Sequence, residues 1–427
     1  MEASSATTPT QSVPADFTIG QHARLTHDEL VAAGPPVDPL APAGRAVVHR
    51  AVRRPKVRVL PAVGDAVRVE YAYLKRDVPN AERVYRRVPK SQKRTIKINQ
   101  GHVFFALELQ RVNDNLYREP PREDTDRSVD VNDGEYQYPY RQQNMVAIKK
   151  VHKRQVHAYL KQGGHENPYT AIHRMQTLGD DHHVLSCIEA LEDDKYLYTI
   201  MRYCEGRSIL DMVPWDSPTG VNEDLARDCM QAVTENLHYL QSHGIAHHDI
   251  SPDNILCLNG RLLLVDLAMS LRVPDGNTDH RRLLKPQGIY GKPPYMSPEV
   301  LMSRGPFDAF ALDVWAAGCV LYNLLTSYYL FKIPHPSDAM FRYFLMAGAL
   351  SNEPVNERTV EVMVDVFQTR QDQEDRQNLL SRAMAHLHLS TEAMDLLHRI
   401  LRLNPRDRAT LANVMESNWM MDGRMTS

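Results

Sequence analysis

Apolar residues alternate with polar ones in the first half of the chain, which is the pattern of half-buried strands. Residues 56–74, KVRVLPAVGDAVRVEYAYL, alternate Val with polar residues around a Gly-Asp turn and predict a β-hairpin. The string TIKINQGHVFFALEL predicts two short strands around Gly101, and NMVAIKKV predicts a β-branched strand that ends in lysines. The polar, acidic insertion between them, residues 113–144, is expected to be an exposed loop.

The later part of the chain shows the spacing of amphipathic helices. Residues 167–179 carry helix punctuation, with Asn167 as the N-cap, Pro168 in the first turn and Gly179 as the stop. A second helix is predicted over residues 222–243, and mostly helix beyond Asp313. Strands first and helices later indicate an α+β fold in two lobes. The apolar residues that recur every three positions in the first helix, and that we expect to be buried, are Tyr169, Ile172, Met175 and Leu178.

The chain has 427 residues, of which 43% are hydrophobic and 24% charged. This composition is close to the globular average and excludes a chain that is disordered throughout. The formal net charge of -3 hides an asymmetry, because residues 45–97 hold 16 lysines and arginines but 4 acidic residues, a local charge of +12. This basic arm predicts an anionic partner, and a solvated charge run is the alternative.

Cysteine usage and the N-terminal segment favour an intracellular, cytoplasmic protein. Five scattered cysteines without CxxC spacing predict neither a disulfide framework nor a zinc site, and they favour a reducing compartment. Residues 1–55, rich in Ala, Pro, Ser and Thr, predict a flexible arm without a secretory signal. The most apolar window begins at Ala316 and runs for 16 residues, which is short for a bilayer span and indicates a core helix, with no membrane span.

The strongest chemical cluster is HHDISPDNIL from His247, followed by LLLVDLA, whose carboxylate is Asp266. A carboxylate and a carboxamide five residues apart, with a second carboxylate after an apolar strand, offer three oxygen ligands to one hard cation and one reacting hydroxyl. Upstream, Lys149 closes a strand and offers a fixed cation to phosphate oxygens. The pattern therefore favours phosphate chemistry, and it depends on joint spacing because each residue alone is commonplace.

These segments resemble the eukaryotic-type protein kinase superfamily, in its Ser/Thr-like branch. VAIK ending at Lys149 matches the family's third-strand lysine, HHDISPDN its catalytic loop, DLA its metal-binding triplet and GKPPYMSPE its peptide-docking segment. DVWAAG from Asp313 and the pair Glu299 with Arg408 match its scaffold. The resemblance covers residues 95–419. It implies a bilobal protein-kinase-like fold, with a small β-rich N-lobe and a larger helical C-lobe.

The resemblance also implies the roles of single residues and two cofactors, ATP and Mg²⁺. Asp249 is expected to orient the substrate hydroxyl and accept its proton, while Asn254 and Asp266 hold Mg²⁺ on the nucleotide. Lys149 is expected to grip the α/β-phosphates. The residues implied to surround the nucleotide are Gly101 in the covering loop, the adenine neighbours Val103, Ala147 and Leu256, the gatekeeper Met201, and the hinge residues Arg202 and Cys204.

The nucleotide-covering loop and the helix after Lys149 depart from the family pattern. The loop retains Gly101, but Ile96 and Ile98 occupy the two earlier glycine positions, which keeps backbone amides further from phosphates. Motif alignment places Ala171 where the family has the glutamate that pairs with Lys149, so Glu166 would have to act from a loop before the helix.

The catalytic segments depart as well. Ala268 ends the metal-binding triplet instead of Gly, and His248 replaces the arginine that clamps a phosphorylated activation segment, which argues against control by such a phosphate. A lysine and a threonine that reach the catalytic aspartate in Ser/Thr-directed relatives are here Ser251 and Lys292, as if exchanged. Lys292 is therefore a candidate catalytic residue, with a solvent-facing lysine as the alternative.

The function predicted from the sequence is transfer of the ATP γ-phosphoryl group to Ser/Thr hydroxyls of a protein substrate. Tyr295 in PPYMSPE favours the Ser/Thr-directed branch. A pseudokinase that acts as a scaffold is the main alternative, and a small-molecule kinase is the second. The expected division of the chain is a flexible arm (1–55), a basic segment (56–94), a kinase N-lobe (95–201), a C-lobe (202–421) and a tail (422–427).

Overall fold

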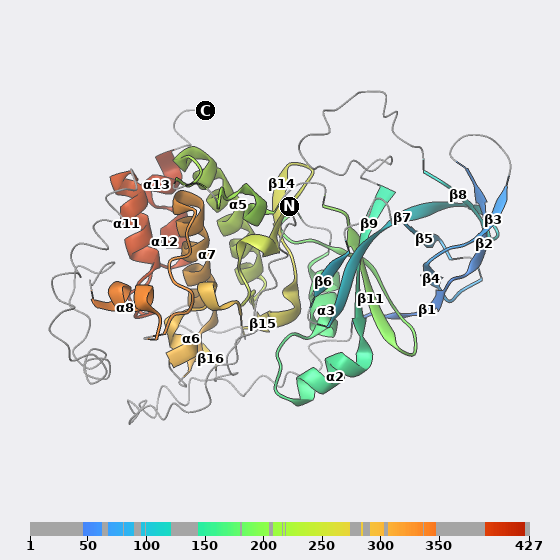
Figure 1. The fold of residues 1–427 in the computed structure, drawn as a ribbon, viewed down its shortest axis with the longest axis horizontal. Helices are drawn as coiled ribbons and strands as arrows, with labels where there is room; N and C mark the ends of the chain where they lie inside the picture. Colours follow the sequence, from blue (N-terminus) through green and yellow to red (C-terminus); the bar gives the residue numbers. More distant parts are fainter. Residues whose placement is uncertain are drawn as a thin grey trace, which may run out of the picture.

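The computed structural model describes residues 46–61, 67–79, 81–88, 95–98, 100–120, 144–179, 182–204, 208–215, 217, 219–273, 283–284, 291–302, 306–335, 337–346 and 389–422. Figure 1 shows the long strands gathered at one end of the molecule and helices at the other, with α2 and α3 beside the strands. We call these ends the strand-rich part and the helical part. The order of strands before helices agrees with the α+β expectation.

The large sheet is built from strands of the first half of the chain. Its strands are β1 (His49–Arg53), β2 (Lys56–Leu60), β3 (Arg68–Tyr71), β4 (Leu74–Arg76), β5 (Arg83–Arg87), β6 (Ile96–Ile98), β7 (Gly101–Asn113), β8 (Leu116–Arg118), β9 (Met145–His152), β10 (Cys187–Glu192) and β11 (Tyr196–Arg202). Short strands elsewhere are β12 (Ile245–Ala246), β13 (Ile255–Leu258), β14 (Arg261–Leu264), β15 (Leu271–Arg272), β16 (Leu283–Leu284) and β17 (Phe307–Asp308).

The helices lie mainly in the second half of the chain. They are α2 (Lys153–Lys161), α3 (Pro168–Leu178), α4 (Ile209–Met212), α5 (Glu223–Ser242), α6 (Pro298–Met302), α7 (Ala309–Thr326), α8 (Ala339–Met346), α11 (Thr391–Ile400), α12 (Leu411–Met415) and α13 (Asn418–Met421). Single 3-10 turns are η4 (Pro252–Asn254), η5 (Leu267–Met269) and η6 (Pro293–Tyr295).

Seven strands of the large sheet close into a ring in the order β7, β5, β4, β1, β10, β11 and β9, because β9 also pairs with β7. All the pairs are antiparallel except that of β1 with β10, which is parallel. One buried cluster draws side chains from each of the seven strands and so fills the interior of a small barrel. Its members are Ala51, Leu74, Tyr85, Phe104, Ala106, Val146, Ile148, Leu191, Tyr198 and Ile200.

The barrel changes the expected division of the chain. The boundary predicted for the flexible arm, residues 1–55, is wrong at its C-terminal end, because His49–Arg53 forms strand β1. Ala51 is the one buried residue of this strand, so the sequence of the segment shows little hydrophobic pattern. The predicted hairpin is confirmed by the antiparallel pairing of β2 with β3. The basic segment 56–94 is nevertheless no separate unit, because β4 and β5 belong to the barrel.

The insertion expected to be a loop over residues 113–144 begins as strand. It opens with the end of β7 and with β8, which pairs with both β7 and β2. A second small core packs this outer hairpin on the barrel, and it contains Val57, Val59, Ala72, Val84, Leu109 and Tyr117. Residues 121–143 of the insertion, residues 1–45 of the arm and residues 423–427 of the tail lie outside the described residues.

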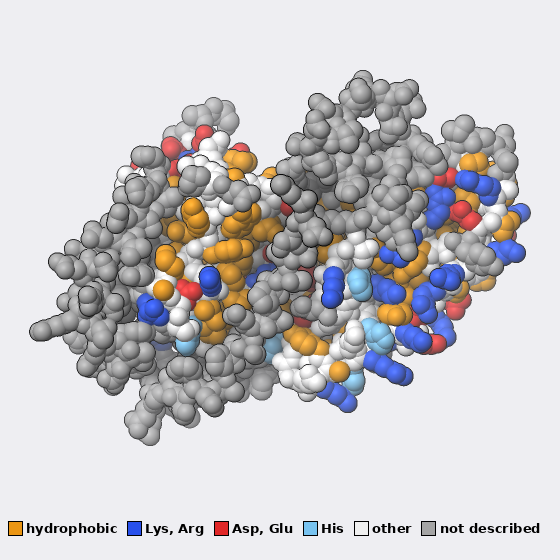
Figure 2. Space-filling model, in the orientation of Figure 1, with side chains coloured by type: hydrophobic (Ala, Val, Ile, Leu, Met, Phe, Trp, Pro, Cys, Tyr) orange, Lys and Arg blue, Asp and Glu red, His pale blue; other side chains and the backbone are white. Residues whose placement is uncertain are grey.

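Several arginines of the strand-rich part form ion pairs with acidic residues of the same part. Figure 2 shows Lys and Arg side chains gathered over the strands, with acidic side chains among them. Arg86 contacts both Glu70 and Glu119, and Arg68 contacts Glu119 as well. Arg76 contacts Glu189 at 3.3 Å. Acidic residues outside the segment, such as Glu119 and Glu189, therefore neutralise part of the +12 charge.

The helical part follows the predicted caps. Asn167 accepts hydrogen bonds from the first turn of α3, which stops at Gly179 with φ 76°. Of its predicted stripe, Ile172, Met175 and Leu178 are buried, whereas Tyr169 is half-buried. Helix α5 begins after its N-cap Asn222 and agrees with the expected 222–243. Helix α7 is long and apolar enough to cross a membrane, but it is almost entirely buried, as expected of a core helix.

Candidate active site

A buried aspartate on α7 shapes the loop that carries Asp249. The two carboxylate oxygens of Asp313 accept the backbone N–H groups of His247 and His248 at 2.7 and 2.8 Å. His248 adopts a left-handed conformation with φ 66°, which turns the chain sharply just before Asp249. The imidazole of His247 is buried and its Nε2 lies 3.0 Å from the carbonyl oxygen of Val265. The loop is therefore anchored just before the aspartate.

Asp249 and Asn254 form a tight pair across the loop. The Asn254 Nδ2 atom donates to both Asp249 Oδ2 and the Asp249 carbonyl oxygen, each at 2.7 Å. The other carboxylate oxygen, Oδ1, is buried and has no hydrogen-bond partner among the described residues. Burial raises the pKa of Asp249 to about 6, although the nearby Lys292 partly opposes this rise. One oxygen is thus held in place while the other has no partner among the described residues.

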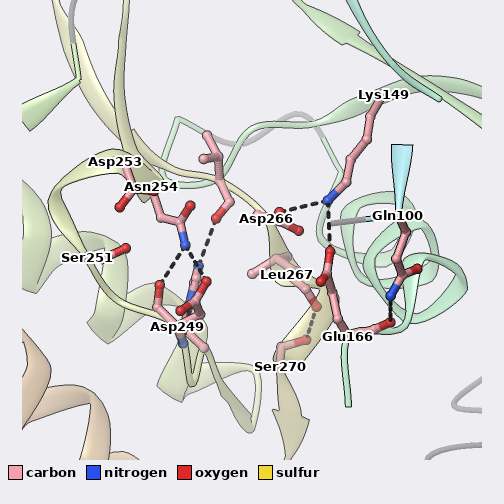
Figure 3. A network of polar contacts seen from close by, with 12 residues as sticks. Gln100, Lys149, Glu166, Asp249, Ser251, Asp253, Asn254, Asp266, Leu267 and Ser270 are labelled. Atoms are coloured by element: carbon pink, nitrogen blue, oxygen red, sulfur yellow. Dashed lines mark hydrogen bonds and ion pairs between the residues drawn. The ribbon is translucent and has the colours of Figure 1, made fainter. Parts of the chain in front are cut away.

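Lys149 joins β9 to the turn that carries Asp266. Its Nζ atom lies 2.7 Å from Asp266 Oδ2 and 3.9 Å from Glu166 Oε1 (Figure 3). Burial disfavours the charged lysine, but Asp266 and then Glu166 outweigh it and raise the pKa of Lys149. Burial likewise opposes ionisation of Asp266, yet Lys149 lowers the pKa of that carboxyl. The pair is therefore ionised around neutral pH.

Asp266 directs one oxygen away from Lys149. The residue has φ 63°, a left-handed conformation that a non-glycine residue adopts at a cost and that here precedes the turn η5. Its Oδ1 atom is buried without a hydrogen-bond partner among the described residues. Ala268, at the expected glycine position, lies in η5 and is buried in the main core, so its Cβ is accommodated there.

Glu166 supplies the second carboxylate of the lysine from outside helix α3. Its side chain is 13% exposed, and its carbonyl oxygen accepts from the Gln100 amide at 3.4 Å. Ala171, which motif alignment placed at the glutamate position, is buried in the core and offers no charge. The sequence placed Glu166 in a loop correctly, but no motif signals its contact with Lys149 or the supporting role of Gln100.

Lys292 folds back over the catalytic loop. Its Nζ atom lies 2.7 Å from Ser251 Oγ, 2.9 Å from Asp253 Oδ2 and 3.5 Å from Asp249 Oδ2. Its side chain is 37% exposed. Burial disfavours its charge, but Asp249 and Asp253 raise the pKa of Lys292. The sequence left open whether Lys292 approaches Asp249 or points into solvent. These contacts do not agree with a lysine that simply points into solvent.

The residues expected around a nucleotide lie on facing strands next to Lys149. Val103 pairs with Lys149 across β7 and β9, and Ala147 pairs with Met201 across β9 and β11. Leu256 bridges to Ser208 at the start of α4. Arg202 is exposed and Cys204 half-buried just beyond the end of β11. The half-buried apolar members of this set are Val103, Ala147, Met201 and Leu256.

The pairing of β7 with β9 explains why a glycine stands at position 101, which the sequence alone did not suggest. A Cβ atom at this position would lie 1.9 Å from the carbonyl oxygen of Lys150, because β7 and β9 approach closely where Gly101 pairs with Val151. The glycine is thus required by strand pairing. Upstream of it, Ile96 and Ile98 form the ends of the short strand β6.

The donor set is consistent with a divalent cation that is shared with phosphate. Among the described residues no group of three or more His, Cys, Asp or Glu side chains could hold a metal ion alone. Mg²⁺, however, is commonly held by one or two carboxylates together with substrate phosphates. The buried, unpartnered Oδ1 of Asp266 fits that requirement, and Asn254 lies on the facing loop (Figure 3).

The scaffold below the site contains a buried arginine that was expected from the sequence. Arg408 binds Glu299 through two nitrogens at 2.7 and 3.0 Å, and it also donates to the carbonyl oxygen of Ala311. The guanidinium lies over the Trp315 ring, 4.9 Å from its centroid. This fork fixes α6, which follows the Lys292 segment, against α7.

Comparison with known proteins agrees with this geometry. Residues 137–420 match the protein kinase domain family. Sperm motility kinase 2B of Mus musculus is 27% identical over 258 residues, which are 60% of this chain and 44% of that protein. Serine/threonine-protein kinase cds1 of Schizosaccharomyces pombe is 25% identical over 303 residues, which are 68% of this chain and 54% of that protein. Serine/threonine-protein kinase CHK1 of Saccharomyces cerevisiae is 32% identical over 206 residues, 47% of this chain and 37% of that protein.

The chain aligns with less than half the length of the mouse sperm motility kinases. The matched region nevertheless includes the catalytic loop, the Asp266 turn, the Lys292 segment and the Arg408 scaffold. With well over half of its residues matched and these motifs in order, the chain belongs to the eukaryotic-type protein kinase superfamily.

Proposed function

We propose that this protein transfers the γ-phosphoryl group of ATP to Ser/Thr hydroxyls of a protein substrate. The observation that carries the proposal is the pair of half-buried carboxylates, Asp249 and Asp266, each with one oxygen held by a neighbour and with a buried Oδ1 atom that has no partner among the described residues. Asn254 and Lys149 are the neighbours that hold them. Phosphoryl transfer depends mainly on positioning and on electrostatic stabilisation, which such fixed charges supply.

Each residue has a role in the proposed reaction. Asp249 orients the substrate hydroxyl and accepts its proton through the unpartnered Oδ1. Asn254 and Asp266 hold Mg²⁺ when the nucleotide is bound, and the ion neutralises charge on the phosphates. Lys149, fixed by Asp266 and Glu166, binds the α/β-phosphates.

The strand-rich and helical parts are, in this proposal, the two lobes of a kinase with the nucleotide between them. Val103 and Ala147 contact one face of adenine, and Leu256 contacts the other. Met201 is the gatekeeper, and the backbone of residues 202–204 binds the adenine edge. The position of Val103, Ala147 and Met201 on β7, β9 and β11, close to Lys149, supports this assignment.

Lys292 replaces, in this proposal, the lysine that Ser/Thr-directed relatives carry two residues after the catalytic aspartate. Its contacts with Ser251 and Asp249 support the exchange, because Ser251 occupies that position in the chain. The ammonium then neutralises charge near the moving phosphoryl group. The names of the relatives cds1 and CHK1 also favour the Ser/Thr class.

The alternative of a scaffold that binds nucleotide without transfer is favoured by one feature. Ile96 and Ile98 place branched side chains in the strand before Gly101, where close approach of amides to phosphate favours glycine.

An intracellular location is consistent with the five free cysteines. An anionic partner of residues 45–97 stays a prediction, limited by the ion pairs of those arginines.

The test is phosphate transfer by the purified full chain to a generic protein substrate with Mg²⁺ and ATP. We expect steady turnover by the parent, and we expect Asp249→Asn and Lys149→Met each to reduce it by at least a hundredfold. Both variants should keep the melting temperature of the parent within a few degrees. Nucleotide binding without any transfer by the parent would instead support the scaffold.

A further inference from the structure

A group of aromatic side chains leads away from the catalytic loop across the helical part. Tyr329, which follows α7, is 45% exposed, and its neighbour Tyr328 is 54% exposed. Trp215, which follows α4, is half-buried and stacks on Tyr329 with ring centroids 4.9 Å apart and planes 26° apart. We call Trp215, Tyr328 and Tyr329 the aromatic platform. Exposed aromatic rings grouped in this way commonly mark binding surfaces.

The aromatic platform is continuous with the proposed acceptor site. Tyr329 meets the buried Tyr295 edge to face at 6.2 Å and shares a side-chain hydrogen bond with it. Tyr295 ends the turn η6, whose N-cap is Lys292, and its N–H donates to the Lys292 carbonyl oxygen at 2.9 Å. Lys292 in turn contacts Asp249. A polypeptide whose hydroxyl reaches Asp249 therefore lies next to these rings.

The rings are held in place before any ligand arrives. The Trp215 indole N–H donates to the Leu210 carbonyl oxygen at 2.9 Å. The segment after Trp215 is tied to the end of α7, because the Val221 N–H donates to the Leu324 carbonyl oxygen at 2.8 Å and the Ser327 hydroxyl donates to Thr219. Preorganised aromatic faces lose little conformational entropy when they bind.

The carboxylate whose charge acts on Tyr329 is that of Asp253. Asp253 itself pairs with Lys292, whose Nζ atom lies 2.9 Å from the Asp253 Oδ2 atom. Asn323, near the end of α7, is neutral, buried and bonded to the Tyr328 carbonyl oxygen. The carboxylate that acts on Tyr329 is therefore already paired, and the rings offer apolar area beside it.

We propose, on the basis of the proposed kinase function, that Trp215 and Tyr329 select substrates with aromatic or aliphatic side chains close to the phosphorylated Ser or Thr. The occupant is the extended segment of the protein substrate that carries the acceptor hydroxyl. Its apolar side chains cover the exposed faces of the two rings, and removal of that area from water supplies the preference.

The test uses two peptides that differ only beside the acceptor serine, one with Phe and Leu and one with Arg at the same positions. Binding is measured by fluorescence anisotropy on versions with Ala in place of Ser, and transfer is measured on the serine versions. We expect the full chain to bind the apolar peptide about tenfold more tightly. Tyr329→Ala and Trp215→Ala should remove that preference, with KM for the apolar peptide raised about tenfold and kcat changed less than twofold.

Two control variants distinguish the platform from general damage. Tyr329→Phe keeps the ring and should keep the preference, and Val69→Ala trims an exposed apolar side chain of β3, remote in the sheet, and should change nothing. Equal binding of the two peptides by the parent, or equal weakening of both by Tyr329→Ala, would overturn the proposal. Selective binding without any transfer would count against the kinase function alone, because anisotropy does not depend on transfer.

Discussion

Lys149 depends on two carboxylates that reach it from different segments of the chain. Asp266 is the nearer partner at 2.7 Å, and Glu166 at 3.9 Å acts from the loop before α3. Because both carboxylates raise the pKa of the lysine against its burial, the second partner helps to keep the ammonium charged and oriented. A missing glutamate on the helix is thus compensated from outside it.

We therefore expect Glu166→Gln to lower kcat about fivefold, which corresponds to about 1 kcal/mol of transition-state stabilisation. The matched control is Glu70→Gln, which removes a partner of Arg86 at 3.3 Å in a half-exposed ion pair on β3, away from the site. Steady-state kinetics with ATP would measure both. If Glu166→Gln is as fast as the parent, the loop carboxylate has no part in holding Lys149.

The exchange of Ser251 and Lys292 gives a second prediction. Lys292→Ala should lower kcat about tenfold with little change in KM for ATP, because the ammonium lies near Asp249 and not beside Lys149. The double variant Ser251→Lys with Lys292→Thr should recover much of the rate, since the two side chains are only 2.7 Å apart. A double variant no faster than Lys292→Ala, or a single variant as fast as the parent, would contradict the exchange.

Sequence patterns predicted the residues of the site because their chemistry is carried by short segments. Asp249, Asn254 and Asp266 keep a fixed spacing; the structure pairs the first two within one loop and places the Asp266 turn across from that loop (Figure 3). The contact of Glu166 was not predictable in the same way, because it depends on where a loop passes β9. Gly101 was assigned to the nucleotide, yet its close approach to Lys150 depends on the pairing of β7 with β9.

At the scale of elements, helix α3 is positioned by its ends. Asn167, its N-cap, donates its N–H to the Ala268 carbonyl oxygen at 2.9 Å and so ties the helix to the Asp266 turn. Near the other end, Gln176 forms two hydrogen bonds of 2.8 Å with the backbone N–H and carbonyl of Val47. The segment before β1 therefore holds the helix that directly follows the Glu166 loop.

We expect Gln176→Ala to loosen this grip at a cost of about 1–2 kcal/mol, because two hydrogen bonds at a partly solvated site are lost. Amide exchange in α3 should become faster and kcat should fall a few-fold. Thr177→Ala is the control, because Thr177 is exposed on the same turn and bonds only within the helix, to the His173 carbonyl oxygen. Unchanged exchange in the Gln176 variant would show that packing alone holds the helix.

Local signals explain why some elements were predictable and others were not. The caps Asn167 and Asn222 and the stop Gly179 act within one turn, so the helix ends follow from neighbouring residues. Strand β1 has one fully buried residue, Ala51, and it pairs with β10 more than a hundred residues away. Such a partner leaves no mark in the strand's own sequence.

For the whole molecule, the closed barrel makes the basic segment part of the folding unit of the kinase domain. Strands β1, β4 and β5 supply Ala51, Leu74 and Tyr85 to the barrel interior. They also satisfy a buried carboxylate, because Glu189 on β10 accepts from the Tyr85 hydroxyl at 2.6 Å and from Arg76 at 3.3 Å. Burial and the neighbouring Glu189 raise the pKa of Tyr85, which keeps its hydroxyl protonated as the donor.

The last prediction is that deletion of residues 1–94 prevents cooperative folding of the strand-rich part. The cut removes three barrel strands and leaves Glu189, whose side chain is 5% exposed, without its two partners. Stranding a buried charge costs about 3–5 kcal/mol before the lost apolar contacts are counted, which is a large share of the stability of a domain. Thermal unfolding and nucleotide binding measure the effect, and deletion of residues 1–45 is the control because it keeps every described strand. Tyr85→Phe, which removes only the hydroxyl, should lower the free energy of unfolding by about 1–3 kcal/mol and so isolate the Glu189 contribution. A chain starting at residue 95 that melts cooperatively within a few degrees of the parent would place β1, β4 and β5 outside the folding unit.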